Sequence, residues 1–135
     1  MQYVDSSALV KRYISEPDTD TALRLLAADP DWVTAAHTLI EVRRTLALRL
    51  GGEPGGAAKA RKAFLLDWDA MRIVALDEQT CVQAAEFAET TRARTLDALH
   101  LAAAHRAGAP ALRVVTFDAR LAQAARSLGW TVVGA

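Results

Sequence analysis

The sequence predicts a single α/β domain built on a parallel sheet. Short apolar segments alternate along the chain with longer segments whose apolar residues recur at helical spacing, and there is no internal repeat. One late segment, residues 112–116, is almost continuously apolar, as expected for a parallel strand buried on both faces. The length of 135 residues suits one domain with a sizeable core. We therefore expect residues 1–135 to form one domain in which helices flank a central parallel sheet.

The first part of the chain predicts one strand and two helices. Residues 2–4 form a short apolar strand. Ser6 or Ser7 can cap a helix that extends to about Ile14, because a hydroxyl oxygen accepts a backbone N–H that is unpaired at a helix start. The Ser-Glu-Pro segment that follows ends this helix. A second helix is expected at residues 18–28.

A long helical segment follows the second strand. A turn at residues 29–31 leads to a short strand at residues 32–34, and the next helix is expected at residues 36–50 because its apolar residues form one stripe. The glycine-rich segment 51–56 predicts a loop. Another helix then extends to about Met71.

Two capping residues predict where the next two helices begin. Residues 72–76 predict a strand. Asp77 is expected to cap a helix that extends to about Thr91, and Thr95 a helix that extends to about Ala107.

The last part of the chain predicts two strands around one helix. The apolar strand at residues 112–116 is followed by a helix at residues 118–128. Gly129 is expected to end this helix, since glycine adopts the left-handed backbone conformation common just past a helix. The final strand is expected at residues 130–133.

Composition excludes several classes of protein. Hydrophobic residues make up 52% of the chain and charged residues 24%, which argues against disorder. The single cysteine, Cys81, excludes an intramolecular disulfide and suits the cytoplasm, and we expect it to be buried in its helix. No charged-then-apolar leader opens the chain, and no apolar stretch approaches the ~20 residues that cross a bilayer. We expect a cytoplasmic protein that is not inserted in a membrane.

Four carboxylates follow predicted strands or lie in the predicted helices. They are Asp5, Glu41, Asp97 and Asp118. In a parallel α/β fold such positions converge at one edge of the sheet. Like charges a few Å apart raise one another's pKa, and a divalent cation with oxygen ligands relieves the repulsion. The set therefore predicts a Mg²⁺ site, with Mn²⁺ as a possible substitute.

Two alternatives compete with this interpretation. Asp5, Asp97 and Asp118 fall at predicted helix starts, where aspartate is favoured as a cap and by the helix dipole. Glu41, inside its predicted helix, cannot be a cap, and this favours a shared site.

The second alternative involves histidine. His37 and Glu41 are four residues apart, and Asp97 and His100 are three apart, so each pair can share a helix face. A histidine-carboxylate site for zinc or iron therefore stays open, although His100 can equally be a packed, hydrogen-bonded histidine.

The charge balance permits a nucleic-acid partner. The formal net charge is zero, with 16 Lys and Arg and 16 Asp and Glu. If four acids share one site, the other twelve face sixteen basic residues, an excess of four positive charges available for phosphate contacts. The candidates for such contacts are Lys11, Arg12, Arg43, Arg44, Arg92 and Arg94.

The segments around the four carboxylates resemble PIN-domain nucleases. They read YVDSSALVK at residues 3–11, LIEVRR at 39–44, TLDALHLA at 95–102 and VTFDARL at 115–121. The match spans nearly the whole chain. The short length, with no appended domain, is similar to the VapC toxins of bacterial toxin–antitoxin pairs in particular.

This resemblance implies a fold, an activity and partners. It implies a three-layer fold with a central parallel sheet, and a magnesium-dependent endoribonuclease that is held inactive by a cognate VapB-like antitoxin. The residues that match the metal ligands are Asp5, Glu41, Asp97 and Asp118, and Ser7 and Thr116 match polar positions beside them. It also implies that the antitoxin's C-terminal segment lies in an apolar groove between helices. The residues that we expect to offer such a groove are Leu9, Ile14, Leu23, Leu26, Phe64 and Leu65.

The chemistry of the residues agrees with phosphodiester hydrolysis. Hard cations on carboxylates supply a nucleophilic water and relieve charge on the leaving oxygen. The sequence shows no histidine pair with plausible acid and base roles, so we expect attack by water rather than by the RNA 2′-hydroxyl. A homodimer is also expected, because small α/β domains commonly bury spare apolar helix faces by two-fold pairing.

Other functions remain as alternatives. One is a PIN-type nuclease that acts in RNA processing, or on DNA, without an antitoxin. A receiver-like phosphoacceptor module is disfavoured, because no Asp-Asp pair follows the first strand and no lysine ends a late strand. The sequence does not specify which RNA is cut or whether one or two ions bind.

Overall fold

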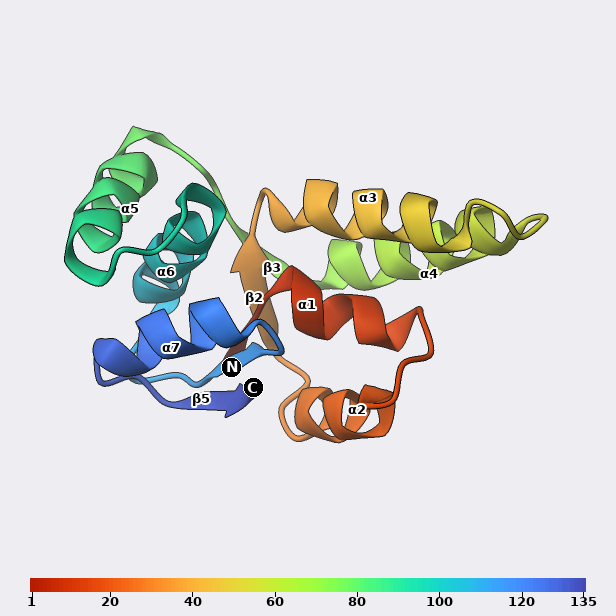
Figure 1. Ribbon diagram of the computed structural model, residues 1–135, viewed down its shortest axis with the longest axis horizontal. Helices are drawn as coiled ribbons and strands as arrows, with labels where there is room; N and C mark the ends of the chain where they lie inside the picture. The colour runs from red at the N-terminus through yellow and green to blue at the C-terminus, as the bar shows by residue number, and fades with distance from the viewer.

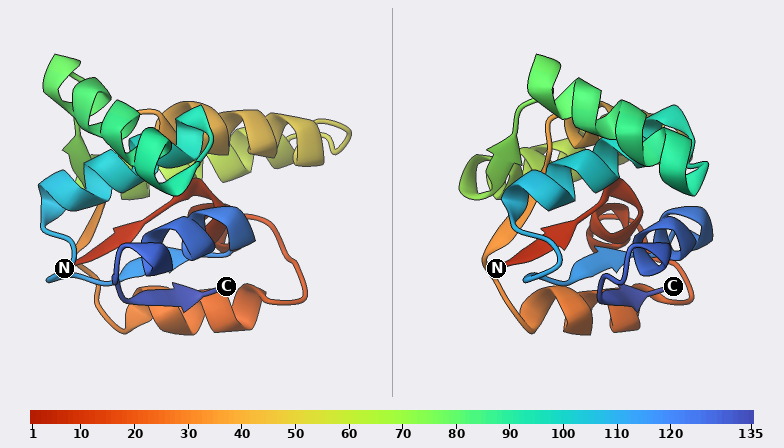
Figure 2. Two further views of the ribbon diagram at one scale, coloured as in Figure 1. Left: turned by 60° about the vertical axis from the view of Figure 1, so that its left-hand side comes forward. Right: turned by 90° about the vertical axis from the view of Figure 1, so that its left-hand side faces the viewer.

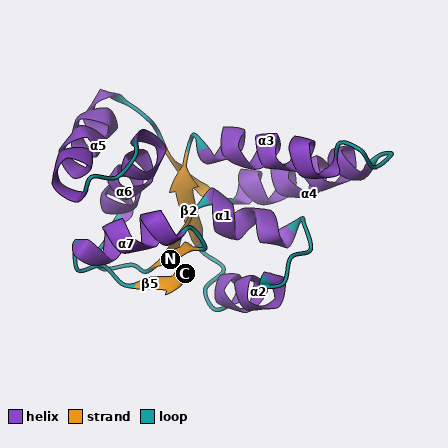
Figure 3. Cartoon of the chain, in the orientation of Figure 1, coloured by secondary structure: helices purple, strands orange, loops and turns teal.

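All five strands of the sheet are parallel, in the order β3-β2-β1-β4-β5. The computed structural model describes every residue from 1 to 135. The strands are β1 (Gln2–Val4), β2 (Trp32–Ala35), β3 (Arg72–Val74), β4 (Val114–Thr116) and β5 (Val132–Gly134). The helices are α1 (Ser6–Leu9), the 3₁₀ helix η1 (Val10–Arg12), α2 (Thr19–Ala27), α3 (Thr38–Leu50), α4 (Gly56–Ala70), α5 (Glu78–Thr91), α6 (Thr95–Ala107) and α7 (Ala119–Ser127). The predicted parallel α/β fold is confirmed (Figure 3).

Helices cover both faces of the sheet, which gives the expected three layers (Figure 1). The helices α6 and α7 pack on one face, and α5 packs against α6. On the other face lie α1, α2 and the hairpin formed by α3 and α4, whose far end projects beyond the sheet (Figure 2). None of these helices is both long enough and apolar enough to cross a membrane.

Neighbouring residues of the central strands point into opposite cores. Tyr3 and Val114 pack beneath α6 and α7, whereas Val4 and Val115 pack beneath α1 and α3. All four side chains are buried, as the alternation of side chains along a strand requires when both faces of a sheet are covered. These contacts hold the carboxyl ends of β1 and β4 side by side.

The helix predicted to extend to Ile14 is shorter than expected. The α-helix ends at Leu9, and η1 continues the chain as a 3₁₀ turn in which the N–H of Tyr13 bonds the carbonyl of Val10. The chain tightens here because the segment that follows contains Pro17, which cannot continue a helix.

The start of α3 also differs from the prediction. Ala36 and His37 form a turn, and the helix begins at Thr38. Glu41 therefore lies in the first turn of α3 rather than in the middle of a helix, as its interpretation from the sequence assumed. Its charge is still favourable there, because the amino end of a helix stabilises negative charge.

The last strand begins two residues later than predicted. Gly129 ends α7 with φ of +77°, as expected. The N–H of Trp130 then bonds the carbonyl of Ala125 at 3.2 Å, so Trp130 completes the helix end and cannot join the sheet. The strands predicted at residues 72–76 and 112–116 are likewise shorter, at 72–74 and 114–116.

The expectation that Cys81 is buried is wrong. The side chain is exposed on α5. The buried residues of this helix are Thr80 and Ala84, four positions apart, so Cys81 falls beside the buried stripe and not within it.

Candidate active site

The four carboxylates lie at helix amino ends beside one edge of the sheet. Asp5 and Asp118 are the N-cap residues of α1 and α7, and Glu41 and Asp97 lie in the first turns of α3 and α6. Asp5 and Asp118 follow the adjacent strands β1 and β4. From β1 the sheet extends through β2 on one side and through β4 on the other, so this edge is a topological switch point, where α/β proteins bind ligands.

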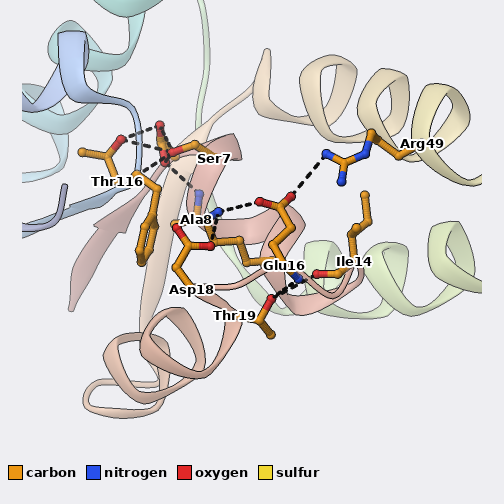
Figure 4. A network of polar contacts seen from close by, with 11 residues as sticks. Ser7, Ala8, Ile14, Glu16, Asp18, Thr19, Arg49 and Thr116 are labelled. Carbon is orange, nitrogen blue, oxygen red and sulfur yellow. Dashed lines mark hydrogen bonds and ion pairs between the residues drawn. The ribbon is translucent and has the colours of Figure 1, made fainter.

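Asp5 is held in a fixed orientation by two hydroxyl groups. Ser7 Oγ donates to its two carboxylate oxygens at 2.7 and 2.9 Å, and Thr116 Oγ1 donates to Oδ2 at 2.8 Å (Figure 4). Ser7 Oγ in turn accepts the Phe117 N–H at 2.8 Å, and Thr116 Oγ1 accepts the Asp118 N–H at 3.0 Å. Since a backbone donor occupies one side of each hydroxyl, its hydrogen is directed to Asp5. The network joins the ends of β1 and β4.

Burial makes Asp5 an unusual carboxylate. It is 2% exposed, and desolvation raises its pKa despite the positive charge of His100 and the hydrogen bonds from Ser7 and Thr116. A buried negative charge of this kind is stabilised by a nearby cation.

Asp97 has no polar partner in the protein. Its half-buried side chain makes no hydrogen bond and no ion pair. Burial and then the charge of Asp118 raise its pKa, and the charges of Asp5 and Glu41 raise it further. The four carboxylates are therefore close enough to affect one another through charge, as the sequence predicted.

Asp118 combines capping with a free oxygen. Its Oδ1 accepts the N–H groups of Arg120 and Leu121 at 2.8 and 3.2 Å, and Asp5 likewise accepts the N–H of Ala8 at 3.1 Å. The capping alternative is thus confirmed for these two residues. It does not exclude metal binding, because Oδ2 of Asp118 has no donor in the protein.

Glu41 is bound to a buried histidine. His100 Nε2 lies 2.7 Å from Glu41 Oε1, and His100 Nδ1 lies 2.7 Å from the hydroxyl of Tyr3. Burial disfavours the charged form of Glu41, but the hydrogen bond and charge of His100 outweigh burial and hold the pKa of Glu41 below its usual value. For His100, burial is outweighed by Glu41 and by the charge of Asp5, so its pKa lies above the usual value.

His37 completes a compact cluster with these two residues. Its Nε2 lies 3.6 Å from Glu41 Oε1, and its ring centroid lies 4.2 Å from that of His100. The ring is buried, and neither nitrogen has a hydrogen-bond partner. Burial and the charge of His100 lower the pKa of His37 to about 4, so this histidine is neutral at pH 7.

Two sets of donors could therefore hold a metal ion. The ligand atoms of His37, Glu41 and His100 lie within 4.8 Å of one another, so the histidine-carboxylate arrangement left open by the sequence exists. However, both nitrogens of His100 are already hydrogen-bonded. The carboxylate set offers only oxygen donors, which hard cations prefer, and includes the unpartnered Asp97. The donor chemistry of the carboxylate set suits a hard divalent cation, and that of the histidine set suits zinc or iron.

Spacing along the chain did not predict that His37 and His100 lie together. Their contact depends on the packing of α6 against β2, which His37 follows in the next turn, and spacing along the chain does not reveal this packing. Both rings are buried, and their centroids are only 4.2 Å apart. They cannot flank a phosphodiester as an acid and a base on opposite sides. Tyr3 was also missed, because nothing distinguishes it from other residues of an apolar strand.

The candidate phosphate contacts divide into paired and free side chains. Lys11 is buried and bonds both Glu16 and Asp18, at 2.8 and 2.7 Å (Figure 4). Arg12 bonds Asp67 at 2.8 Å. Lys11 and Arg12 are therefore already paired with acidic side chains of the protein. The remaining four candidates, Arg43, Arg44, Arg92 and Arg94, make no side-chain ion pair.

A hollow lies where the sequence predicts an apolar groove, between the early helices and α4, but most of the residues expected to line it do not. Of those six residues Leu23 lines it, together with Arg12, Tyr13, Ala63, Leu66 and Asp67. Leu9, Ile14, Leu26 and Phe64 are buried in the core between the sheet and its helices. The residues are apolar because they form this core, and so they are not available to a partner. A second open groove, of about 440 Å³, lies between α3 and α4. Its lining residues are Leu39, Ile40, Arg43, Arg44, Leu46, Ala47, Ala57 and Arg61.

Comparison with known proteins gives consistent matches. A family model described as PIN domain matches residues 2–127. Ribonuclease VapC46 of Mycobacterium tuberculosis is 36% identical over 131 residues, which cover 97% of this chain and 95% of that protein. The crystal structure of Mycobacterium tuberculosis VapC20, described as a sarcin-ricin loop cleaving toxin, has a TM-score of 0.74 at 22% identity and covers 100% of this chain and 98% of that chain. A toxin-antitoxin complex from Klebsiella pneumoniae has a TM-score of 0.66 at 14% identity, with 87% of each chain covered.

Proposed function

The chain belongs to the PIN domain family, and on this premise we propose that it is a divalent-cation-dependent endoribonuclease that acts as the toxin of a VapBC-type pair. The ribonuclease name of the relative at 36% identity supports the activity. The similarity to a toxin-antitoxin complex supports the pairing. We place its RNA substrate, and hence the protein, in the cytoplasm.

The four carboxylates are the proposed ligands of Mg²⁺, with Mn²⁺ as a substitute. Such an ion supplies, when bound, a nucleophilic water at neutral pH and relief of charge on the phosphate oxygens. Ser7 and Thr116 keep the carboxylate of Asp5 in one orientation. His100 keeps Glu41 ionised and fixes its direction.

Asp97 is the observation that supports this proposal most strongly. A half-buried carboxylate without a hydrogen-bond partner, close to three other acids, is unfavourable in the absence of a cation. The first test is therefore incubation of the purified protein with single-stranded RNA in Mg²⁺ and in chelator. Cleavage is expected only with the cation.

The cleavage products should carry a 5′-phosphate and a 3′-hydroxyl. His37 and His100 are both buried, so neither histidine is placed to deprotonate an RNA 2′-hydroxyl. Attack by water leaves these ends. End-labelling of the fragments measures the outcome, and a majority of 2′,3′-cyclic phosphate ends would refute this part of the proposal.

We assign the antitoxin segment to the groove between α3 and α4. Its lining is apolar with an arginine rim, which suits an extended or helical segment that carries apolar and acidic residues. The substitution Ala47→Glu places a carboxylate on the groove wall, and we expect it to weaken co-purification with the protein encoded next upstream by about tenfold or more.

The neighbouring residue provides a matched control. Leu48 is 66% exposed and lies outside the groove, so Leu48→Glu should leave co-purification unchanged. Equal retention of the partner by Ala47→Glu would show that the antitoxin binds elsewhere. If no partner is encoded nearby, the alternative of a PIN-type nuclease in RNA processing is favoured.

A homodimer is part of the same proposal. The exposed apolar side chain of Leu66 on α4 supplies surface that two-fold pairing can cover. Sedimentation at micromolar concentration should give twice the 14.5 kDa mass of one chain.

A further inference from the structure

Another hollow adjoins the acidic site and is lined by three arginines. It has a volume of about 400 Å³ and lies between the segment that joins α5 to α6 and the helix α7. Arg92 and Arg94 come from the joining segment, and Arg120 comes from α7. Asp97, one of the four carboxylates, lines the same hollow. The hollow is therefore continuous with the proposed site of cleavage.

The three arginines have no anionic partner in the protein. All three side chains are exposed, and none makes a hydrogen bond or an ion pair. Other arginines of the chain do have anionic partners, since Arg12 pairs with Asp67 and Arg106 pairs with Asp77. Three guanidinium groups around one hollow repel one another, and a bound anion relieves this repulsion.

The backbone of Arg92 provides an independent observation. It has φ of +64° at the end of α5 and is the only residue other than glycine with a positive φ in the chain. Glycine is favoured at this position of a helix end because a side chain is strained there. Strain of this kind persists at functional sites. An arginine at a position where glycine is more stable indicates that its side chain is used.

On the basis of this hollow, we propose that Arg92, Arg94 and Arg120 bind a backbone phosphate of the RNA strand adjacent to the phosphate that is cleaved. The inference rests on the proposed ribonuclease function and names a part of its substrate site. The planar fork of arginine matches phosphate geometry. A strand with one phosphate at the carboxylates has its next phosphate about one nucleotide away, and the hollow adjoins the carboxylates at Asp97.

The lining of the hollow favours a nucleic-acid backbone over a polypeptide. Of its nine residues only two are apolar, Ala93 and Ala124. The groove between α3 and α4 has five apolar residues among eight. A polypeptide buries apolar side chains when it binds, whereas a phosphodiester backbone needs charge.

The test is the affinity for a fluorescein-labelled single-stranded RNA of twelve nucleotides, measured by anisotropy in chelator so that no cleavage occurs. The substitutions Arg92→Gln, Arg94→Gln and Arg120→Gln should each weaken binding about 3–10-fold. Each should also reduce the slope of log K against log salt by about 0.7. Arg24→Gln on α2 removes the same charge away from the hollow, since Arg24 contacts only Thr21, and should change neither quantity.

The variant Arg92→Gly separates binding from structure. It removes the backbone strain and should raise the melting temperature by about 3–5 °C, while it weakens RNA binding as Arg92→Gln does. If Arg92 were only structural, the RNA affinity would not fall.

Failure of this inference is distinct from failure of the proposed function. Metal-dependent cleavage by the wild type, with unchanged RNA affinity in all three glutamine variants, would overturn the phosphate subsite and leave the ribonuclease intact. Arginine-dependent binding of poly-L-glutamate without arginine-dependent binding of RNA would also overturn it and assign the hollow to an acidic polypeptide. Arginine-dependent RNA binding without cleavage would support the subsite and count against the catalytic proposal.

Discussion

Asp5→Asn is expected to reduce metal-dependent RNA cleavage by about a hundredfold or more. Asp5 lies at the junction of β1 and β4, where its charge acts on Asp97, and its substitution removes this charge from the proposed cation site. The fold should persist, because the amide oxygen of asparagine can still accept the N–H of Ala8 and the hydroxyl hydrogen of Ser7, and only the bond from Thr116 to Oδ2 is lost. Cleavage of a labelled RNA and a thermal melt measure the two properties.

Asp77→Asn is the matched control for this variant. Asp77 caps α5 through the N–H of Thr80, as Asp5 caps α1, but it belongs to none of the proposed sites. It should retain full cleavage. A folded Asp5→Asn protein that cleaves as fast as the wild type would contradict the catalytic role of Asp5.

Asp97→Asn is expected to abolish cleavage to a similar degree and to stabilise the protein in chelator. The pKa of Asp97 is raised by burial and by Asp118, so at neutral pH its ionised form is less stable in the folded chain than in the unfolded chain. Neutralisation should raise the free energy of unfolding by about 0.5–1 kcal/mol, after allowance for solvent screening of a partly exposed group. No hydrogen bond is lost, since Asp97 makes none.

Magnesium should stabilise the wild type more than Asp97→Asn. By mass action a ligand stabilises the folded protein that binds it, and the variant lacks one of the proposed ligands. Asp69→Asn, at an exposed aspartate of α4, is the control that should change neither the melting temperature nor its response to the ion. An Asp97→Asn protein that melts with the wild type in both conditions would show that Asp97 carries no unrelieved charge.

The sequence predicted most of the fold because its signals are local. Apolar alternation located the strands, and Asp77 and Gly129 marked helix ends through bonds to residues a few positions away. Asp5 and Asp118 could be placed together because they follow parallel strands, whose carboxyl ends meet at one edge.

The remaining features depend on packing between distant segments. The contact of His37 with His100 requires α6 to pack against β2 and the turn that follows it. Arg92 and Arg120 line one hollow only because α7 packs near the segment that joins α5 to α6. The apolar residues first assigned to a partner groove, such as Phe64, are core because the hairpin of α3 and α4 folds back on the sheet. A pattern of apolar residues predicts that one face of a helix is buried, but it does not distinguish burial in the protein's own core from burial against a partner.

Direct measurement of Mn²⁺ binding by calorimetry tests the shared carboxylate site most directly. Wild type should bind the ion, and Asp97→Asn should lose most of this affinity. His37→Gln should bind as the wild type does, because His37 belongs only to the histidine cluster. Unchanged binding by Asp97→Asn together with its loss in His37→Gln would contradict the carboxylate site and place the metal at His37, Glu41 and His100.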